Sequence, residues 1–237
     1  MTFKDGDFLE VDYSMWSASD NELMATTEEQ RAKAGGVYDK DFHYGPALVI
    51  LGTGGVIKGL DSALRTMSVS ESKKFTLKPE DAFGERNEDL VRVMPIAEFR
   101  KNDVKPYPGM RVRLDDAQAV VRSVEPGRVV VDANHPYAGR EVVYEVKVVR
   151  VLNSDNDKIA ALGRSYGVSP TSVNSADKTA SISFSDSVKK DADYFIGKAN
   201  LVASVFSNLK SVEKVRIEEE YLRPKEKKEE KSKEEQQ

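Results

Sequence analysis

Hydrophobic and polar residues alternate in several segments of the chain, which is the pattern of β-strands with one buried face. The clearest segment runs from Phe8 to Trp16, where Leu9, Val11, Tyr13 and Met15 share the apolar face. Tyr13 is therefore predicted to face a core or a cavity. Further strands are predicted at Lys73 to Lys78, Val91 to Met94, Met110 to Leu114, Ala119 to Val124, Val129 to Asp132, Glu141 to Leu152, Thr179 to Phe184 and Val212 to Tyr221.

Four segments have helical patterns. Thr26-Thr27-Glu28-Glu29 has the spacing of a capping box, which predicts a short helix that ends at Gly35-Gly36. Pro95 to Lys101 predicts a helical turn, and Lys158 to Tyr166 a helix. Ala192 to Leu209 predicts a longer helix. Its apolar stripe, of the kind that usually faces a core, consists of Phe195, Ile196, Ala199, Val202, Ala203, Phe206 and Leu209.

The stretch from Ala47 to Leu64, ALVILGTGGVIKGLDSAL, predicts a buried strand, a tight glycine loop and a short helix. A phosphate-binding loop is excluded on two grounds. The dinucleotide motif requires a third glycine where Ile57 stands, and the nucleotide motif requires Gly-Lys-Ser/Thr where the chain has Lys58-Gly59-Leu60. The apolar residues Val56 and Ile57 after the glycines indicate an apolar ledge.

Composition narrows the class of protein. The 237 residues include 36 basic and 40 acidic ones, a balance that does not favour nucleic-acid binding. There is no cysteine, and His43 and His135 are the only histidines, so neither a disulfide framework nor a metal site is expected. The N-terminus lacks a secretory signal, and no apolar run reaches the ~20 residues that span a bilayer. We therefore expect a cytoplasmic protein with no membrane association.

The residue pattern of the chain changes at three places. From Asn87 onward the strands are short, and Glu125-Pro126-Gly127-Arg128 is a hairpin signal, which predicts a compact β-rich insert. Asn153 to Asp157 is polar and predicts a linker. From Arg223 the chain is almost wholly Lys, Glu, Ser and Gln, which predicts a disordered tail.

These features together resemble the FK506-binding class of peptidyl-prolyl cis/trans isomerases. The resemblance rests on the strand with the inward Tyr13, the glycine loop with its Val-Ile ledge, the Asp81-Ala82-Phe83-Gly84 turn, and the HPYAG turn before Val143-Tyr144-Glu145-Val146. The insert resembles the insert-in-flap domain of SlyD-like members, and archaeal long-form members have the most similar layout.

The resemblance implies an α+β fold in which an antiparallel half-barrel sheet wraps on a short helix. Its expected domains are an isomerase domain at residues 1–87 and 135–152, an insert-in-flap domain at 88–134, a small α+β domain at 153–222 and the tail at 223–237. The implied pocket residues are Tyr13, Val56, Ile57, Leu60, Phe83 and Tyr144. In the family, the backbone N–H at the position of Ile57 binds the substrate carbonyl.

Three departures from the family pattern concern this pocket. Ala25 stands where the family commonly has an aspartate, Phe83 where it usually has a tyrosine, and Leu60 where a large aromatic is often found. Two hydrogen-bonding side chains are thus missing. This puts tight binding of the macrolide drug in doubt more than catalysis.

The implied function is isomerisation of Xaa-Pro bonds in unfolded or partly folded polypeptides, with chaperone assistance from the insert and without a cofactor or metal. Apolar residues of the insert divide between its own core and a peptide-binding groove: Val91, Val93, Met94, Ile96, Phe99, Val104 and Tyr107. The C-terminal domain could form a homodimer, dock on the ribosome or another partner, or extend the chaperone surface. A non-catalytic chaperone and a structural adaptor remain as alternative functions.

Overall fold

The computed structural model describes residues 3–114, 117–185 and 190–222, and its fold is of the predicted α+β class. The chain divides into two compact units, Met1–Val151 and Leu152–Gln237. The first unit contains a five-stranded main sheet and a four-stranded inserted sheet, and the second contains a three-stranded sheet. The predicted disordered tail at 223–237 lies outside the described residues. No helix in the described part of the chain is long and apolar enough to cross a bilayer.

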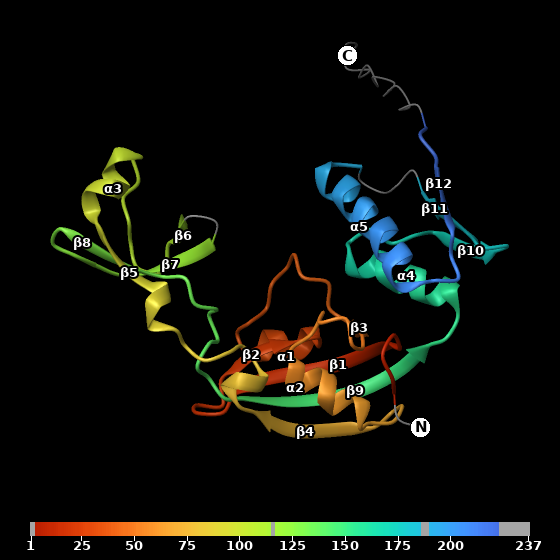
Figure 1. The fold of residues 1–237 in the computed structure, drawn as a ribbon, viewed down its shortest axis with the longest axis horizontal. Helices are drawn as coiled ribbons and strands as arrows, with labels where there is room; N and C mark the ends of the chain where they lie inside the picture. The colour runs from red at the N-terminus through yellow and green to blue at the C-terminus, as the bar shows by residue number, and fades with distance from the viewer. Residues whose placement is uncertain (1–2, 115–116, 186–189, 223–237) are drawn as a thin grey trace, which may run out of the picture. The chain divides into compact units, whose positions relative to one another are not determined.

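The main sheet of the first unit has the strand order β2-β1-β9-β4, with β3 also paired to β1 (Figure 1). Strand β1 is long enough to pair with two partners, using its first half for β3 and its second half for β2, both antiparallel. The strands are β1 (Phe8–Ser17), β2 (Leu23–Thr26), β3 (Ala47–Ile50), β4 (Ser72–Leu77) and β9 (Val142–Leu152).

Helix α2 (Lys58–Arg65) supplies the apolar surface against which this sheet packs. Leu60 and Leu64 are one helical turn apart and almost fully buried, in the same hydrophobic cluster as Val11 and Tyr144. Residues four apart lie on one face of a helix, so this pair faces the sheet. The short helix after the glycine loop is therefore confirmed.

Strand β1 is buried on both faces along much of its length, which differs from the predicted half-buried strand. Leu9, Val11 and Met15 are buried as expected, but Glu10 and Ser14 on the opposite face are buried as well. The Glu10 carboxylate accepts two hydrogen bonds from Arg150 of β9, at 2.7 and 3.2 Å. The second face is buried because its polar groups are hydrogen-bonded to neighbouring strands. The alternation of apolar and polar residues does not predict this burial.

The capping-box prediction was wrong, although the helix exists. Helix α1 (Glu29–Ala34) has Glu28 at its N-cap and no side-chain cap. Thr26 is the last residue of β2, and its hydroxyl is hydrogen-bonded to the Ser14 hydroxyl at 2.7 Å. Pairing with β1 holds Thr26 in the sheet, and its hydroxyl accepts from the Glu28 N–H at 3.1 Å. It therefore bonds the residue before the helix and none of the N–H groups within it.

The insert is a four-stranded antiparallel sheet of order β5-β8-β7-β6. The predicted strands, helical turn and hairpin are confirmed. Phe99, Val121, Val129 and Val131 form its core, whereas Val93 is 63% exposed. Its elements are β5 (Val91–Pro95), α3 (Ile96–Lys101), β6 (Arg111–Leu114), β7 (Ala117–Glu125) and β8 (Arg128–Asp132), with 3-10 helices η1 (Pro79–Asp81) and η2 (Glu88–Leu90) before it.

The second unit has three strands and two helices. Strand β11 pairs antiparallel with β10 and parallel with β12, and α5 lies between β11 and β12 in the chain. Its elements are α4 (Asp155–Ser165), β10 (Ser172–Ala176), β11 (Thr179–Phe184), α5 (Ala192–Asn208) and β12 (Lys214–Glu219). The polar strand β10 was not predicted.

Two predictions for the second unit were wrong. Asn153 to Asp157 is not a linker, because α4 begins at Asp155 with the Ser154 hydroxyl as its N-cap. The predicted stripe of α5 is not its buried face. Phe195, Ile196 and Phe206 are 48%, 59% and 48% exposed. The residues of α5 that are buried are Tyr194, Gly197, Leu201 and Val205.

Candidate functional site

The glycine loop between β3 and α2 is shaped by two left-handed backbone positions. Gly52 and Gly54 have φ angles of 77° and 73°, which other residues rarely adopt. The Gly52 N–H donates a hydrogen bond to the Asp61 carboxylate of α2 at 2.9 Å, and Arg65 holds that carboxylate from the other side at 2.8 Å. The loop is therefore anchored to the helix that follows it.

Ile57 is the N-cap residue of α2, with extended backbone angles of φ −60° and ψ 147°. Its carbonyl accepts the first helical hydrogen bond, from the Asp61 N–H at 3.1 Å. Its own N–H has no hydrogen-bond partner among the described residues. A free backbone donor thus lies at the end of the loop.

A pocket of about 540 Å³ opens beside this loop. Five of the six predicted site residues line it: Tyr13, Val56, Ile57, Leu60 and Phe83. The rest of the lining consists of Val11, Ala47, Leu48, Val49, Gly54, Gly55 and His135. The wall is thus almost wholly apolar. Its polar side chains are a phenol and an imidazole.

Tyr144, the sixth predicted residue, does not line the pocket. Its side chain is 5% exposed and belongs to the core below the sheet surface. Its ring lies 5.9 Å from the ring of Tyr13 and 6.1 Å from that of Phe75, measured between centroids. Tyr144 therefore packs against Tyr13 in the core and is not part of the pocket wall.

Two aromatic residues that the sequence pattern did not single out, His135 and Tyr137, contact Phe83, and His135 also lines the pocket. The His135 ring stacks on Phe83 at 4.6 Å with an interplanar angle of 6°, and the Tyr137 ring meets Phe83 edge-on at 5.3 Å. The Tyr137 hydroxyl donates to the Met24 carbonyl at 3.3 Å. The HPYAG turn contains both residues. The pattern of this segment predicts only a turn, but two aromatic rings within one turn could have indicated a contact with the pocket.

The phenols of the site stay protonated near neutral pH. Burial raises the pKa of Tyr13, and the nearby Tyr137 phenol raises it further. Burial likewise raises the pKa of Tyr144, with smaller contributions from Tyr13 and Tyr137. Each hydroxyl is therefore a neutral hydrogen-bond donor. Among the described residues that line the pocket there is no Asp, Glu, Lys or Arg.

In the described part of the chain, no three His, Asp or Glu side chains gather into a group that could bind a metal ion. The pocket offers an apolar wall, the neutral hydroxyl of Tyr13 and the free backbone N–H of Ile57. This arrangement can bind an uncharged, partly apolar group and change its environment from water to hydrocarbon.

Comparison with known proteins assigns this chain to a family. Residues 1–99 match the profile of "FKBP-type peptidyl-prolyl cis-trans isomerase", and residues 92–137 match that of "FKBP26, IF domain". The chain is 32% identical over 154 residues to a short-type peptidyl-prolyl cis-trans isomerase of Methanocaldococcus jannaschii, covering 97% of that protein and 65% of this chain. The chain belongs to the FKBP-type peptidyl-prolyl cis-trans isomerase family. It is an isomerase whose substrates are proline-containing polypeptides.

SlyD proteins are also similar to this FKBP-type isomerase. The SlyD of Vibrio cholerae is 35% identical over 144 residues, which is 59% of this chain and 71% of the relative. The SlyD of Escherichia coli K12 is 30% identical over 142 residues, 58% of this chain and 72% of the relative. The resemblance noted in the sequence, including the insert-in-flap domain, is therefore confirmed.

The departures from the family pattern can now be placed in the FKBP-type fold. Ala25 lies on β2 opposite Met15 of β1 and packs against the core. Phe83 brings a ring without a hydroxyl to the pocket wall. The Tyr137 hydroxyl, close to Tyr13, adds a polar group that the sequence analysis had not counted.

Proposed function

We propose that the prolyl bond of a client polypeptide is bound and rotated in the pocket beside the glycine loop. Tyr13, Val56, Ile57, Leu60 and Phe83 form its wall, and Tyr144 positions Tyr13. Rotation about an amide has a barrier of about 18–20 kcal/mol and breaks no bond. The reaction therefore needs an environment that favours the twisted amide, and it needs no nucleophile or acid.

The apolar wall supplies that environment. A planar amide is stabilised in water by charge separation between its oxygen and nitrogen, and this separation decreases as the bond twists. Transfer from water to an apolar pocket consequently disfavours the planar ground state relative to the twisted transition state. Neutral phenols, kept protonated by burial, do not restore the polarity of water.

The free N–H of Ile57 is the observation that carries this proposal. It lies on the pocket wall without a partner among the described residues, so it can donate to the backbone carbonyl of the proline itself, outside the rotating amide. That bond would hold the prolyl side still while the preceding carbonyl group turns, without stabilising the planar amide. The Tyr13 hydroxyl is a further donor at the same site.

Proline at position 57 tests this role of the backbone. The φ angle of Ile57, −60°, is the value that proline adopts, so Ile57→Pro removes the N–H without strain at that residue. Ile57→Ala removes the side chain and keeps the donor. We expect Ile57→Pro to reduce kcat/KM for an Ala-Pro peptide about fivefold to a hundredfold more than Ile57→Ala does, since leaving a buried carbonyl without its donor costs about 1–3 kcal/mol. Equal losses would refute the role of the N–H.

We also propose that the insert binds unfolded segments and so gives the isomerase chaperone activity. A groove of about 350 Å³ crosses it, with Met94, Val104, Met110 and Leu114 among its lining. Methionine side chains adapt to ligands of different shape, which suits binding to many sequences. Glu98, Arg111 and Arg113 edge the groove and keep it accessible to water.

A homodimer formed through α5 is the third part of the proposal. The apolar stripe of this helix has a phenylalanine at each end and smaller side chains near its middle. It consists of Phe195, Ile196, Ala199, Val202, Ala203 and Phe206, of which Val202 is half-buried and the others are exposed. An antiparallel copy would set Phe195 against Phe206 and Ala199 against Val202. Two-fold interfaces require such a self-complementary surface.

A further inference from the structure

An exposed aromatic cluster lies on the segment between α1 and β3, residues 37–46, here named the aromatic loop. Tyr38 and Phe42 are 44% and 49% exposed. The rings of Tyr38 and Tyr44 stack at 5.6 Å with an interplanar angle of 7°, and Phe42 meets Tyr44 edge-on at 4.9 Å. Large aromatic side chains usually contribute to a core or an interface. These rings contribute to neither in the fold described above.

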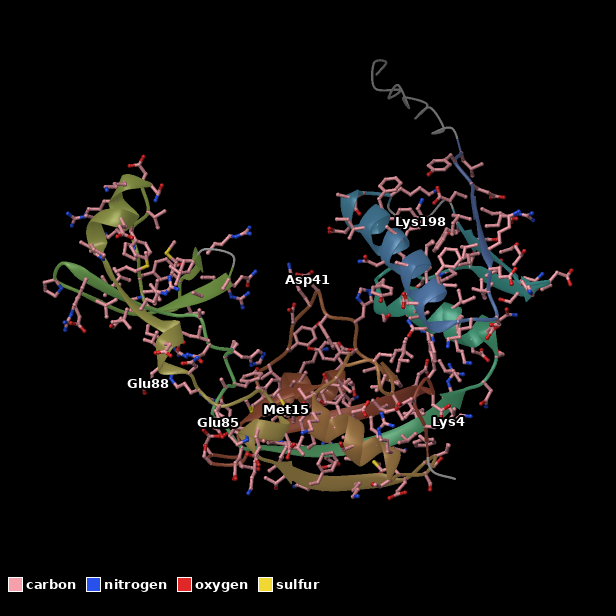
Figure 2. All side chains as sticks on the ribbon, viewed as in Figure 1. Lys4, Met15, Asp41, Glu85, Glu88 and Lys198 are labelled. Carbon is pink, nitrogen blue, oxygen red and sulfur yellow. The ribbon has the colours of Figure 1, made fainter. Side chains whose placement is uncertain are left out.

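The aromatic loop holds its own conformation. The Asp39 N–H donates to the Tyr44 hydroxyl at 2.9 Å, and the Asp39 carboxylate accepts from the Asp41 N–H at 2.9 Å. The base of the loop is fixed by the Gly45 N–H, which donates to the Thr27 carbonyl at 2.9 Å. Figure 2 shows the loop projecting from its sheet, with Asp41 at the tip. A surface ordered in advance binds at a lower entropic cost.

The aromatic loop leads directly into the wall of the isomerase pocket. It is followed by Ala47, Leu48 and Val49, which all line the pocket. Tyr44 precedes Ala47 by three residues, so their Cα atoms are at most about 10–11 Å apart. An extended client peptide advances by the same length per residue. A client side chain three or four positions from the prolyl bond can therefore reach the aromatic rings.

The charges around the loop do not select a charged ligand. Lys33 lies with its ammonium group 4.8 Å from the centre of the Tyr38 ring, and Lys40 is offset by Asp39 and Asp41. A cationic side chain would find one ring already occupied by a lysine. The ring surfaces that remain exposed favour an apolar or aromatic partner.

Resting on the proposed function of the pocket, we propose that the aromatic loop is a second subsite of the isomerase. It binds an apolar or aromatic side chain of the client, three or four residues from the Xaa-Pro bond. This subsite would direct the enzyme to proline residues near the hydrophobic segments of unfolded chains, where delayed isomerisation leaves apolar surface exposed.

The test uses Ala-Pro peptides that carry Phe, Leu or Ser three or four positions before or after the proline. For the unmodified enzyme, we expect kcat/KM to be about threefold to tenfold higher with Phe than with Ser on one side of the proline, the size of an aromatic contact. The ratio should fall to about one in Phe42→Ser and in the Tyr38→Ser/Phe42→Ser double variant.

Val69→Ser is the matched control, because Val69 has the same 49% exposure as Phe42 but lies outside the aromatic loop. It should keep the full Phe-to-Ser ratio. Each ratio compares two peptides on one enzyme preparation, so partial misfolding of a variant cancels. Peptides isomerised without a Phe preference, or a preference that persists in the double variant, would overturn this inference and leave the proposed pocket intact. No isomerisation of any peptide would overturn both.

Discussion

The guanidinium group of Arg86 and the carboxylate of Asp132 meet at 2.7 Å, where the chain enters and leaves the insert. Beside them, Asn87 and Asn134 exchange two hydrogen bonds of 2.8 Å between backbone and side chain. We name this group of four residues the neck. It links the segment that enters the insert directly to the segment that leaves it.

Asp132 gives the neck a predictable dependence on pH. Burial alone would raise the pKa of its carboxyl group, but hydrogen bonds from Asn134, Arg122 and Arg86 outweigh burial and hold the pKa well below its usual range. Its contribution to stability is thus present above the unfolded pKa, about 4, and is lost as the pH falls toward the folded value.

Asp132→Asn should therefore destabilise the protein at pH 7. We expect a loss of about 1–3 kcal/mol in the free energy of unfolding. This is less than the loss expected for a fully buried ion pair, because the two arginine partners of Asp132 are half exposed to water. Urea denaturation should show the difference from the unmodified protein shrinking as the pH falls below about 4. A difference that grows in acid would contradict the assigned role, and Lys105→Glu, which changes an exposed charge of the insert, serves as the control.

Removal of the insert separates the two proposed activities. Because Asn87 and Asn134 are hydrogen-bonded, residues 88–134 can be deleted and the gap closed by a short linker. Refolding of a proline-limited protein should slow far more than isomerisation of a short peptide, since the insert raises the local concentration of the client near the pocket. Met110→Glu, which charges the groove, should reproduce the effect in part. Equal loss on both substrates would refute the chaperone role.

The apolar stripe of α5 makes the homodimer testable by light scattering. Val202→Glu places a charge near the centre of the proposed two-fold contact and should convert a dimer to a monomer. Asn200→Glu introduces the same charge at an exposed position of the same helix, about 100° around the helix from the centre of the stripe, and should leave the dimer intact. A mass that is monomeric for the unmodified chain at micromolar concentration would rule out the dimer, and an equal effect of both variants would reject this face.

Gly197 decides which face of α5 is buried. A Cβ atom at this position would collide with the backbone carbonyl of Tyr166 and approach Val168 to 2.8 Å. Gly197→Ala should consequently destabilise the protein by about 1–3 kcal/mol, although alanine favours helices by about 1 kcal/mol. Ser207→Ala, on the exposed surface of the same helix, should be neutral or slightly stabilising. Thermal unfolding of the two variants gives the comparison, and a stabilised Gly197→Ala would disprove the close contact.

The error over α5 shows the limit of hydrophobic periodicity. Phe195, Ile196 and Phe206 form a stripe of correct spacing, but that spacing shows only that a face is apolar, without showing what covers it. The close approach at Gly197 turns a different face, with Leu201 and Val205, toward the core of the second unit. A glycine adds nothing to a hydrophobic pattern, so its role in close packing can be recognised only when its neighbours in the fold are known.

The main site was predicted more fully. Strand β1 with Tyr13, the glycine loop and the ledge of Val56 and Ile57 lie within continuous stretches whose local pattern determines their structure. Five of the six predicted residues therefore line one pocket. His135 and Tyr137 were missed, because the turn that contains them has no periodic pattern and meets Phe83 only through the folded chain.

The sequence by itself determined most of the strands, the glycine loop with the short helix after it, the β-rich character of the insert and the apolar character of the pocket. All of these depend on neighbouring residues in the chain. Only the tertiary structure decided that Thr26 belongs to a strand, that Tyr144 lies behind Tyr13 and that α5 exposes its aromatic residues. Each of these depends on contacts between residues far apart in the sequence, where packing and hydrogen bonding outweigh local preference.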